Sequence, residues 1–138
     1  MLEDLINFMF PPRCIFCGTV LAYGTDLEIC GNCFAGIPFL SESASMLLKK
    51  GMQRHQCDDV VCVCEYRGMV SKALKKYKFF DKPSYYRALA KLLAGKVKEV
   101  TNCRNFDIII SVPLHRNKER ERGYNQSLLI SRALSRET

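Results

Sequence analysis

Eight cysteines give this 138-residue chain its clearest chemistry, and four of them form two CxxC pairs. Cys14 and Cys17 make the first pair, Cys30 and Cys33 make the second, and twelve residues separate the pairs. Each CxxC turn directs two thiolates toward one point, so two such turns can complete a tetrahedral site. The spacing predicts a structural Zn²⁺ with four protein ligands and no open position. Disulfides and a redox CxxC are the alternatives.

The other four cysteines do not follow a familiar ligand pattern. Cys57, Cys62 and Cys64 are spaced C-x₄-C-x-C, and Cys103 is isolated. In a strand, Cys62 and Cys64 would share one face. A second metal cluster is the alternative, but we interpret these residues as free thiols in apolar surroundings.

A basic stretch near the C-terminal end is the second group with chemistry. Its cations are Arg116, Lys118, Arg120 and Arg122, which alternate with Asn117, Glu119 and Glu121. An extended loop would put all four cations on one side, where they could hold a phosphate or pyrophosphate with Asn125 as a further polar ligand. In a helix, Arg116–Arg120 and Lys118–Arg122 would instead be like-charged neighbours. A solvated loop without a ligand is the third alternative.

Charge is unevenly distributed along the chain. The net charge is +7, with −1 over residues 1–56 and +8 over residues 57–138. The second part therefore favours polyanions or phosphorylated ligands, although a merely soluble basic surface fits as well. Within it, one face of a predicted helix carries a weaker candidate nucleic-acid site, made of Lys72, Lys75, Lys76 and Lys78.

The elements that must position these groups follow an α/β order. Short apolar runs predict strands over 59–66 and 106–113, and helical spacing predicts helices over 2–10, 69–80 and 86–100 and from residue 124 onward. A strand, a basic loop and a helix in succession are typical of an anion site at the carboxyl end of a sheet. We predict two domains: an N-terminal helix and zinc ribbon over 1–45, and an α/β domain over 46–138.

Targeting signals are not recognisable in the sequence. No apolar run approaches the roughly 20 residues that span a bilayer, and the N-terminus has no basic region followed by a cleavage site. A cytoplasmic location without a membrane span is the expectation.

Several motifs, taken together, resemble the ComF family of bacterial competence and phosphoribosyltransferase-like proteins. They are the Cys₄ ribbon, Tyr66-Arg67-Gly68, Lys78-Phe79, Ser111-Val112-Pro113-Leu114-His115-Arg116 and Arg122-Gly123-Tyr124-Asn125-Gln126. Each motif alone is weak, but the resemblance covers nearly the whole chain in order.

The resemblance implies a zinc ribbon followed by the first part of a type I phosphoribosyltransferase-like, Rossmann-like sheet with flanking helices. It implies that the loop from His115 to Arg122 binds the pyrophosphate group of phosphoribosyl diphosphate, accompanied by Mg²⁺ only in a full-length form. It also implies a role in DNA uptake during natural competence. Single-stranded DNA and competence or helicase proteins are the partners expected from that role.

One family motif has no counterpart in this sequence. The phosphoribosyl-diphosphate loop of the family consists of an apolar strand, two acidic residues and a Thr/Gly-rich turn. Asp58-Asp59 resembles its beginning, but Cys62-Val63-Cys64 follows in place of the turn, and the segment precedes the basic loop. We therefore expect a C-terminally truncated gene product or a part of a longer protein, with no transferase activity of its own. The alternative is a zinc-ribbon adaptor that binds single-stranded DNA without catalysis.

Overall fold

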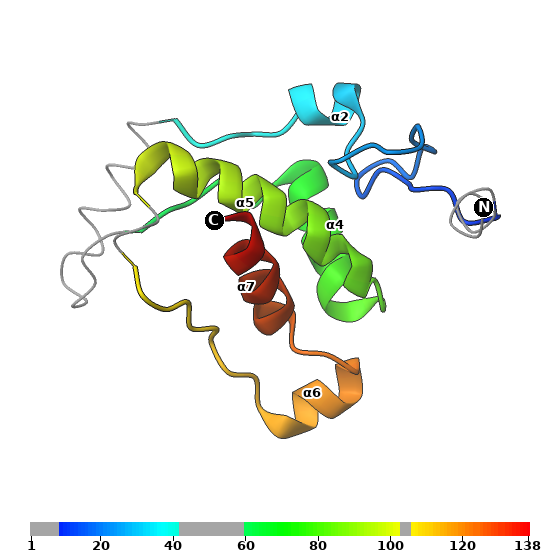
Figure 1. Cartoon of the computed structure of the whole chain (residues 1–138). Coiled ribbons are helices and arrows are strands. Elements are labelled where there is room, and N and C mark those ends of the chain that lie inside the picture. Colours follow the sequence, from blue (N-terminus) through cyan, green and yellow to red (C-terminus); the bar gives the residue numbers. More distant parts are fainter. Residues whose placement is uncertain (1–8, 42–59, 103–105) are drawn as a thin grey trace.

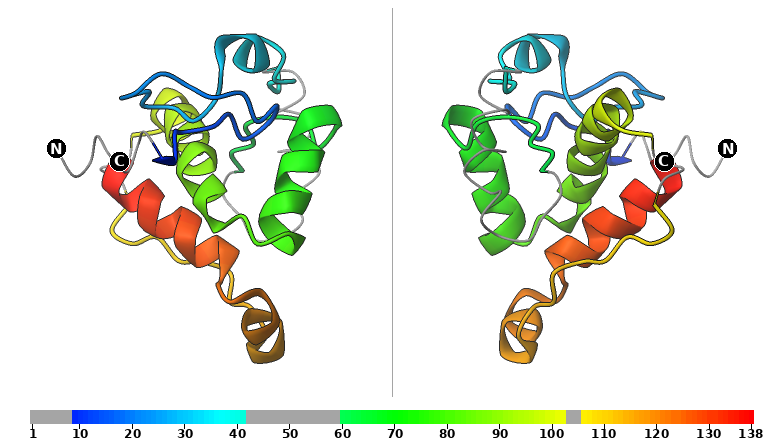
Figure 2. Two further views of the ribbon diagram at one scale, coloured as in Figure 1. Left: turned by 90° about the vertical axis from the view of Figure 1, so that its right-hand side faces the viewer. Right: turned by 90° about the vertical axis from the view of Figure 1, so that its left-hand side faces the viewer.

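The computed structural model describes residues 9–41, 60–102 and 106–138. In these ranges the helical elements are α2 (Gly31–Ala35), α4 (Gly68–Phe79), the 3₁₀ turn η1 (Pro83–Tyr85), α5 (Tyr86–Val100), α6 (Arg116–Arg122) and α7 (Gln126–Glu137) (Figure 1). The cysteine segment, which is residues 9–41, covers one end of α4 and α5, α7 packs against α5, and α6 projects at the opposite end (Figure 2). No helix among these residues is long and apolar enough to cross a membrane.

The two amphipathic helices predicted in the middle of the chain are confirmed. α4 buries Val70, Ala73 and Tyr77 on one face, at the helical spacing that the sequence shows. α5 buries three alanines, Ala88 among them. The sequence predicts one apolar face for α5, but the helix has neighbours on two sides, the cysteine segment and α7.

The cysteine segment and the helices share one apolar core. Its buried residues are Cys14, Ile15, Ile29 and Ile37 from the cysteine segment, Val70 from α4 and Ala88 from α5. At the edge, Lys91 Nζ donates to the backbone oxygen of Asp26 at 2.7 Å and also contacts its carboxylate. The cysteine segment is thus attached to α4 and α5 by apolar burial. The predicted domain boundary, after residue 45, lies outside the described residues, as does nearly all of the helix predicted over 2–10.

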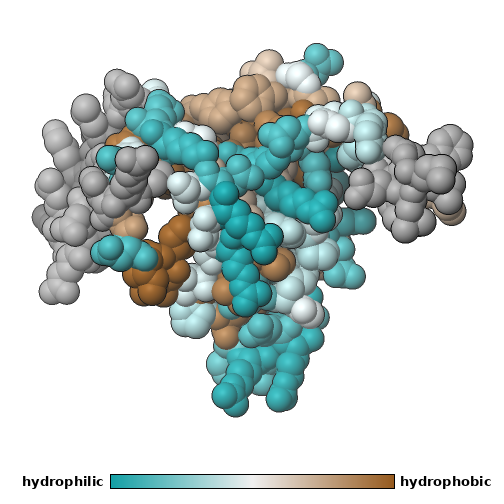
Figure 3. Space-filling view, viewed as in Figure 1, coloured by the Kyte–Doolittle hydropathy of each residue, from teal (hydrophilic) through white to brown (hydrophobic). Residues whose placement is uncertain are grey.

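The predicted sheet is not confirmed in the described ranges. Their β-structure consists of two isolated antiparallel bridges, Arg13–Val20 and Phe39–Cys64. The segment 106–113 has no regular structure, and side chains such as Ile108 and Ile110 are 72% and 79% exposed. Apolar surface is visible in Figure 3 where this segment runs beside α7. A strand needs a neighbour for its backbone hydrogen bonds, and the described ranges provide none for this segment.

Candidate metal centre and anion-binding cleft

The first CxxC turn is closed by backbone hydrogen bonds around a left-handed glycine. The Gly18 N–H donates to the Cys14 carbonyl and the Cys14 N–H donates to the Thr19 carbonyl, both at 2.9 Å. Gly18 has a φ of +79°, a conformation that other residues adopt only with strain. This turn brings Cys17 back beside Cys14.

The second CxxC pair begins α2. Cys30 is the N-cap residue, and its carbonyl accepts the Phe34 N–H at 2.9 Å. Cys33 therefore lies about one helical turn from Cys30, on the same side. The Ile15 N–H donates to the Glu28 carbonyl at 3.0 Å, which joins the first turn to the chain just before the second pair.

These two turns bring four sulfur atoms together. The Sγ atoms of Cys14, Cys17, Cys30 and Cys33 all lie within 4.8 Å of one another. The Sγ atoms of Cys17 and Cys30 are 3.7 Å apart, and a tetrahedral Zn²⁺ with Zn–S bonds of about 2.3 Å requires a separation of about 3.8 Å. All four cysteines are free thiols. The donor set and its geometry fit a zinc ion, and four protein ligands leave no position for a substrate.

The thiols of the cluster differ in acidity. Hydrogen bonding with the side chain and backbone of Thr19 lowers the pKa of Cys17 to about 6, whereas burial raises the pKa of Cys33 to about 12. Four thiolates at these distances would repel one another, so a divalent cation is needed to offset their charge. Metal binding at neutral pH is therefore expected to release protons.

The remaining described thiols stand outside this cluster. Cys62 and Cys64 are half-buried and free, and burial raises the pKa of Cys64. Among the residues that the structure describes, the four-cysteine group is the one cluster of potential metal ligands. Cys57 and Cys103 lie outside the described residues.

The basic stretch forms a helix, so the helical alternative holds and the extended one is wrong. The N-cap residue of α6 is His115, whose Nδ1 accepts the Asn117 N–H at 3.3 Å. The helix ends at Gly123, whose φ is +75° and whose N–H donates to the Glu119 carbonyl at 2.8 Å. Because residues two apart on a helix differ by about 200°, the four cations do not share one face as they would in an extended loop.

A cleft of about 590 Å³ lies between the end of α4 and α6. Its charged lining residues are Lys78, Lys118, Arg120 and Arg122, with Asp81 and Glu121 as the two acids. The Arg122 guanidinium lies 4.9 Å from the centre of the Phe79 ring, in a cation–π contact. The structure thus joins two motifs, Lys78-Phe79 and Arg122-Gly123-Tyr124, that are more than 40 residues apart in sequence.

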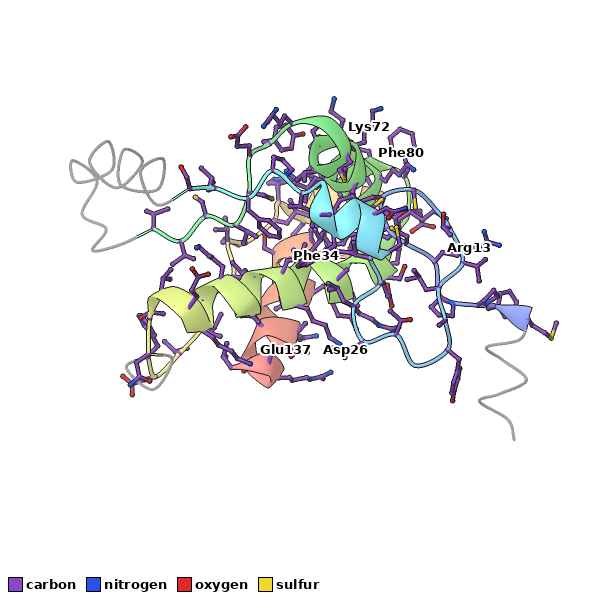
Figure 4. The ribbon with its side chains drawn as sticks, turned by 90° about the horizontal axis from the view of Figure 1, so that it is seen from above. Arg13, Asp26, Phe34, Lys72, Phe80 and Glu137 are labelled. Atoms are coloured by element: carbon purple, nitrogen blue, oxygen red, sulfur yellow. The ribbon has the colours of Figure 1, made fainter. Side chains whose placement is uncertain are left out.

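The other residues predicted to bind an anion or a nucleic acid do not line this cleft. Arg116 is exposed and does not line the cleft. Asn125 caps α7, since its Oδ1 accepts the Leu128 N–H at 3.1 Å. Lys72, Lys75 and Lys76 are exposed on α4, and Figure 4 shows Lys72 on the side of α4 that faces away from α5. The sequence prediction does not include the contact of Phe79 with Arg122, although an aromatic residue directly after Lys78 is a signal for such a contact.

Comparisons with known proteins agree with the cysteine cluster and with the family resemblance. A family model described as a double zinc ribbon domain matches residues 5–61, which include all four clustered cysteines. Competence protein F of Haemophilus influenzae is 30% identical over 96% of this chain, and the chain spans 62% of that relative's length. No solved structure matches the chain significantly. The resemblance to the ComF family is therefore confirmed: the chain is a homologue of competence protein F with a zinc ribbon in its N-terminal part.

Proposed function

We propose that this chain is the zinc-ribbon part and the adjoining helices of a ComF-type, phosphoribosyltransferase-like protein associated with DNA uptake. In this proposal the cleft between α4 and α6 binds phosphate or pyrophosphate groups. The observation that carries the proposal is the meeting of Lys78 with the α6 cations around one cleft. Isothermal titration with inorganic pyrophosphate tests it, and we expect saturable binding that weakens with salt.

The lining of the cleft suits a multivalent anion. Four cations against two carboxylates leave a net positive surface, and guanidinium groups such as Arg120 can hold phosphate oxygens in pairs. The Phe79 ring fixes the guanidinium of Arg122 from one side. A ligand with two linked phosphate groups could contact α4 and α6 at once, which favours pyrophosphate over a single phosphate.

The metal ions have separate roles in the proposal. Zn²⁺ held by the four clustered cysteines stabilises the N-terminal part and takes no part in catalysis. Mg²⁺ prefers oxygen ligands, and no carboxylate cluster suited to it is found in the described ranges. Mg²⁺ would therefore come with phosphoribosyl diphosphate in a full-length form, and we expect no glycosyl transfer by this chain alone.

The exposed segment 106–112 supports the sheet proposed for the full-length form. Its apolar residues Phe106, Ile108, Ile110 and Val112 are each more than 60% exposed. An apolar stretch of this kind is usually covered by other protein. We propose that it is the first core strand of the domain over 46–138, with neighbours from the remaining length of a longer form.

Replacing Ile110 by lysine is expected to reduce self-association of this chain. An exposed apolar strand is a template for pairing between copies, and a charge in its centre opposes that pairing. Light scattering over a concentration series measures the effect. The Tyr23→Lys variant, altered at a residue that is 65% exposed in the cysteine segment, is the control and should associate like the wild type. Equal association of all three proteins would contradict the prediction.

Binding of single-stranded DNA is the second candidate function. Phe79 and Phe80 are 64% and 66% exposed at the end of α4, next to the lysines of its exposed face. Exposed aromatic rings among cations can stack bases while the lysines contact the backbone. This candidate would also suit an adaptor that binds a competence or helicase protein.

A salt series with a fluorescent oligonucleotide separates the two candidates. Binding that weakens with salt but ignores added pyrophosphate supports the DNA site alone. Competition by pyrophosphate indicates that both ligands use the cleft. An affinity that does not respond to salt would contradict the second candidate.

A further inference from the structure

Helix α6, which carries most of the cleft's cations, has no apolar anchor of its own. All seven of its residues are polar or charged, and none is buried. It projects from the body of the molecule, as Figures 1 and 2 show. A helix of this length is not stable by itself in water. Its position relative to α4 must therefore be determined at the junctions where it meets the rest of the chain.

Two tyrosines attach the junction after α6 to α4. The hydroxyl of each one donates a hydrogen bond to a backbone carbonyl on the other side. The Tyr124 hydroxyl donates to the backbone carbonyl of Tyr77. In return, the Tyr77 hydroxyl donates to the backbone carbonyl of Gln126 at 2.8 Å. The centres of the two rings are 5.7 Å apart. These two hydrogen bonds connect the last turn of α4 with the α6–α7 junction, across 47 to 49 positions of sequence.

The two hydroxyls can act as donors throughout the physiological pH range. Tyr77 is 1% exposed, and burial raises the pKa of Tyr77 and also that of Tyr124. Both groups therefore keep their protons near neutral pH. Each tyrosine is also adjacent in sequence to a cation of the cleft. Tyr77 directly precedes Lys78, and Gly123 alone separates Tyr124 from Arg122.

We infer that the hydroxyls of Tyr77 and Tyr124 position the α6 cations against Lys78 and Phe79, and so set the anion affinity of the cleft. This inference rests on the proposed function of the cleft. Tyr124 also lines the cleft, but its hydroxyl donates to the Tyr77 carbonyl, so the role inferred for it is positioning and not contact with the anion. Without the two hydroxyls, the rings and every charge remain, and α6 stays near α4 through the contact between the two rings and the Arg122–Phe79 contact.

Single-hydroxyl deletions test this inference on the full, zinc-loaded chain. We expect Tyr124→Phe and Tyr77→Phe each to weaken binding of inorganic pyrophosphate roughly three- to ten-fold, the equivalent of about one hydrogen bond. Amide hydrogen exchange should become faster in α6 and its junction and stay unchanged in α5. The matched control is Tyr66→Phe, which deletes a hydroxyl from a residue that is 61% exposed, and it should change neither measurement.

The possible results separate this inference from the proposed function. Wild-type affinity in a folded Tyr124→Phe chain would overturn the positioning role, even if its melting temperature is lower. An equal loss of pyrophosphate affinity in Tyr66→Phe would overturn it as well.

If the wild type binds no pyrophosphate, the proposed function fails. Faster exchange confined to α6 in Tyr124→Phe would still support the attachment of α6 by these hydroxyls, whereas unchanged exchange would overturn that too. Because Tyr77 is buried and its variant could unfold, Tyr124→Phe decides the outcome.

Discussion

Replacing Cys14 by serine is expected to abolish zinc binding and to unfold the cysteine segment. A hydroxyl is a poor ligand for Zn²⁺, and structural zinc contributes about 10–16 kcal/mol in small zinc-finger peptides at pH 7. The expected loss is therefore comparable to the whole stability of a domain, about 5–15 kcal/mol. The sequence alone predicts damage limited to the N-terminal part. Because Cys14 packs in one core with Val70 and Ala88, we expect α4 and α5 to be destabilised as well.

Metal analysis and thermal unfolding measure this effect. The wild type should hold one Zn²⁺ per chain and unfold cooperatively, and Cys14→Ser should do neither. Cys62→Ser is the matched control, since it replaces a half-buried thiol outside the cluster and should keep the zinc. A Cys14→Ser protein with unchanged zinc content would show that the four-cysteine assignment is wrong.

Replacing Arg122 by glutamate is expected to have the largest effect on anion binding. Arg122 lines the cleft and is held over the Phe79 ring, so the change removes a cation and adds a carboxylate at the same point. We expect pyrophosphate affinity to fall by about 100-fold, or roughly 3 kcal/mol, which is typical for loss of a charge-assisted contact with added repulsion.

A second charge reversal controls for the overall charge of the protein. Lys98→Glu makes the same change on α5, at a residue that lines a different cleft from Arg122. Isothermal titration with pyrophosphate should show a small, salt-sensitive loss for this variant. Similar losses in the two variants would mean that only net charge matters and that the cleft has no specific role. Arg122→Lys should fall between the wild type and Arg122→Glu, because it keeps the charge but not the planar group.

The helices of this chain could be predicted well because their signals are local. The apolar spacing in α4 places Val70, Ala73 and Tyr77 on one face, and the structure buries all three. Composition predicts a strand over 106–113, and the sheet to which it would belong is not confirmed in the described ranges. Strand pairing depends on a partner that local composition does not specify. The sequence also leaves open whether the basic stretch is extended or helical, because its alternating charges fit both conformations.

The sequence by itself determined the four clustered cysteines. Two CxxC turns at this spacing supply four ligands to one tetrahedral ion, and the geometry of each turn is set by neighbouring residues. The sequence also determined which residues carry the positive charge. Only the tertiary structure decided which cations meet: it brings Lys78 beside Arg122 and leaves Arg116 outside the cleft. That meeting depends on the contacts of Tyr77 with Tyr124 and Gln126. Such contacts between residues more than 40 positions apart arise from packing and from hydrogen bonds of side chains to backbone carbonyls, which no local pattern encodes.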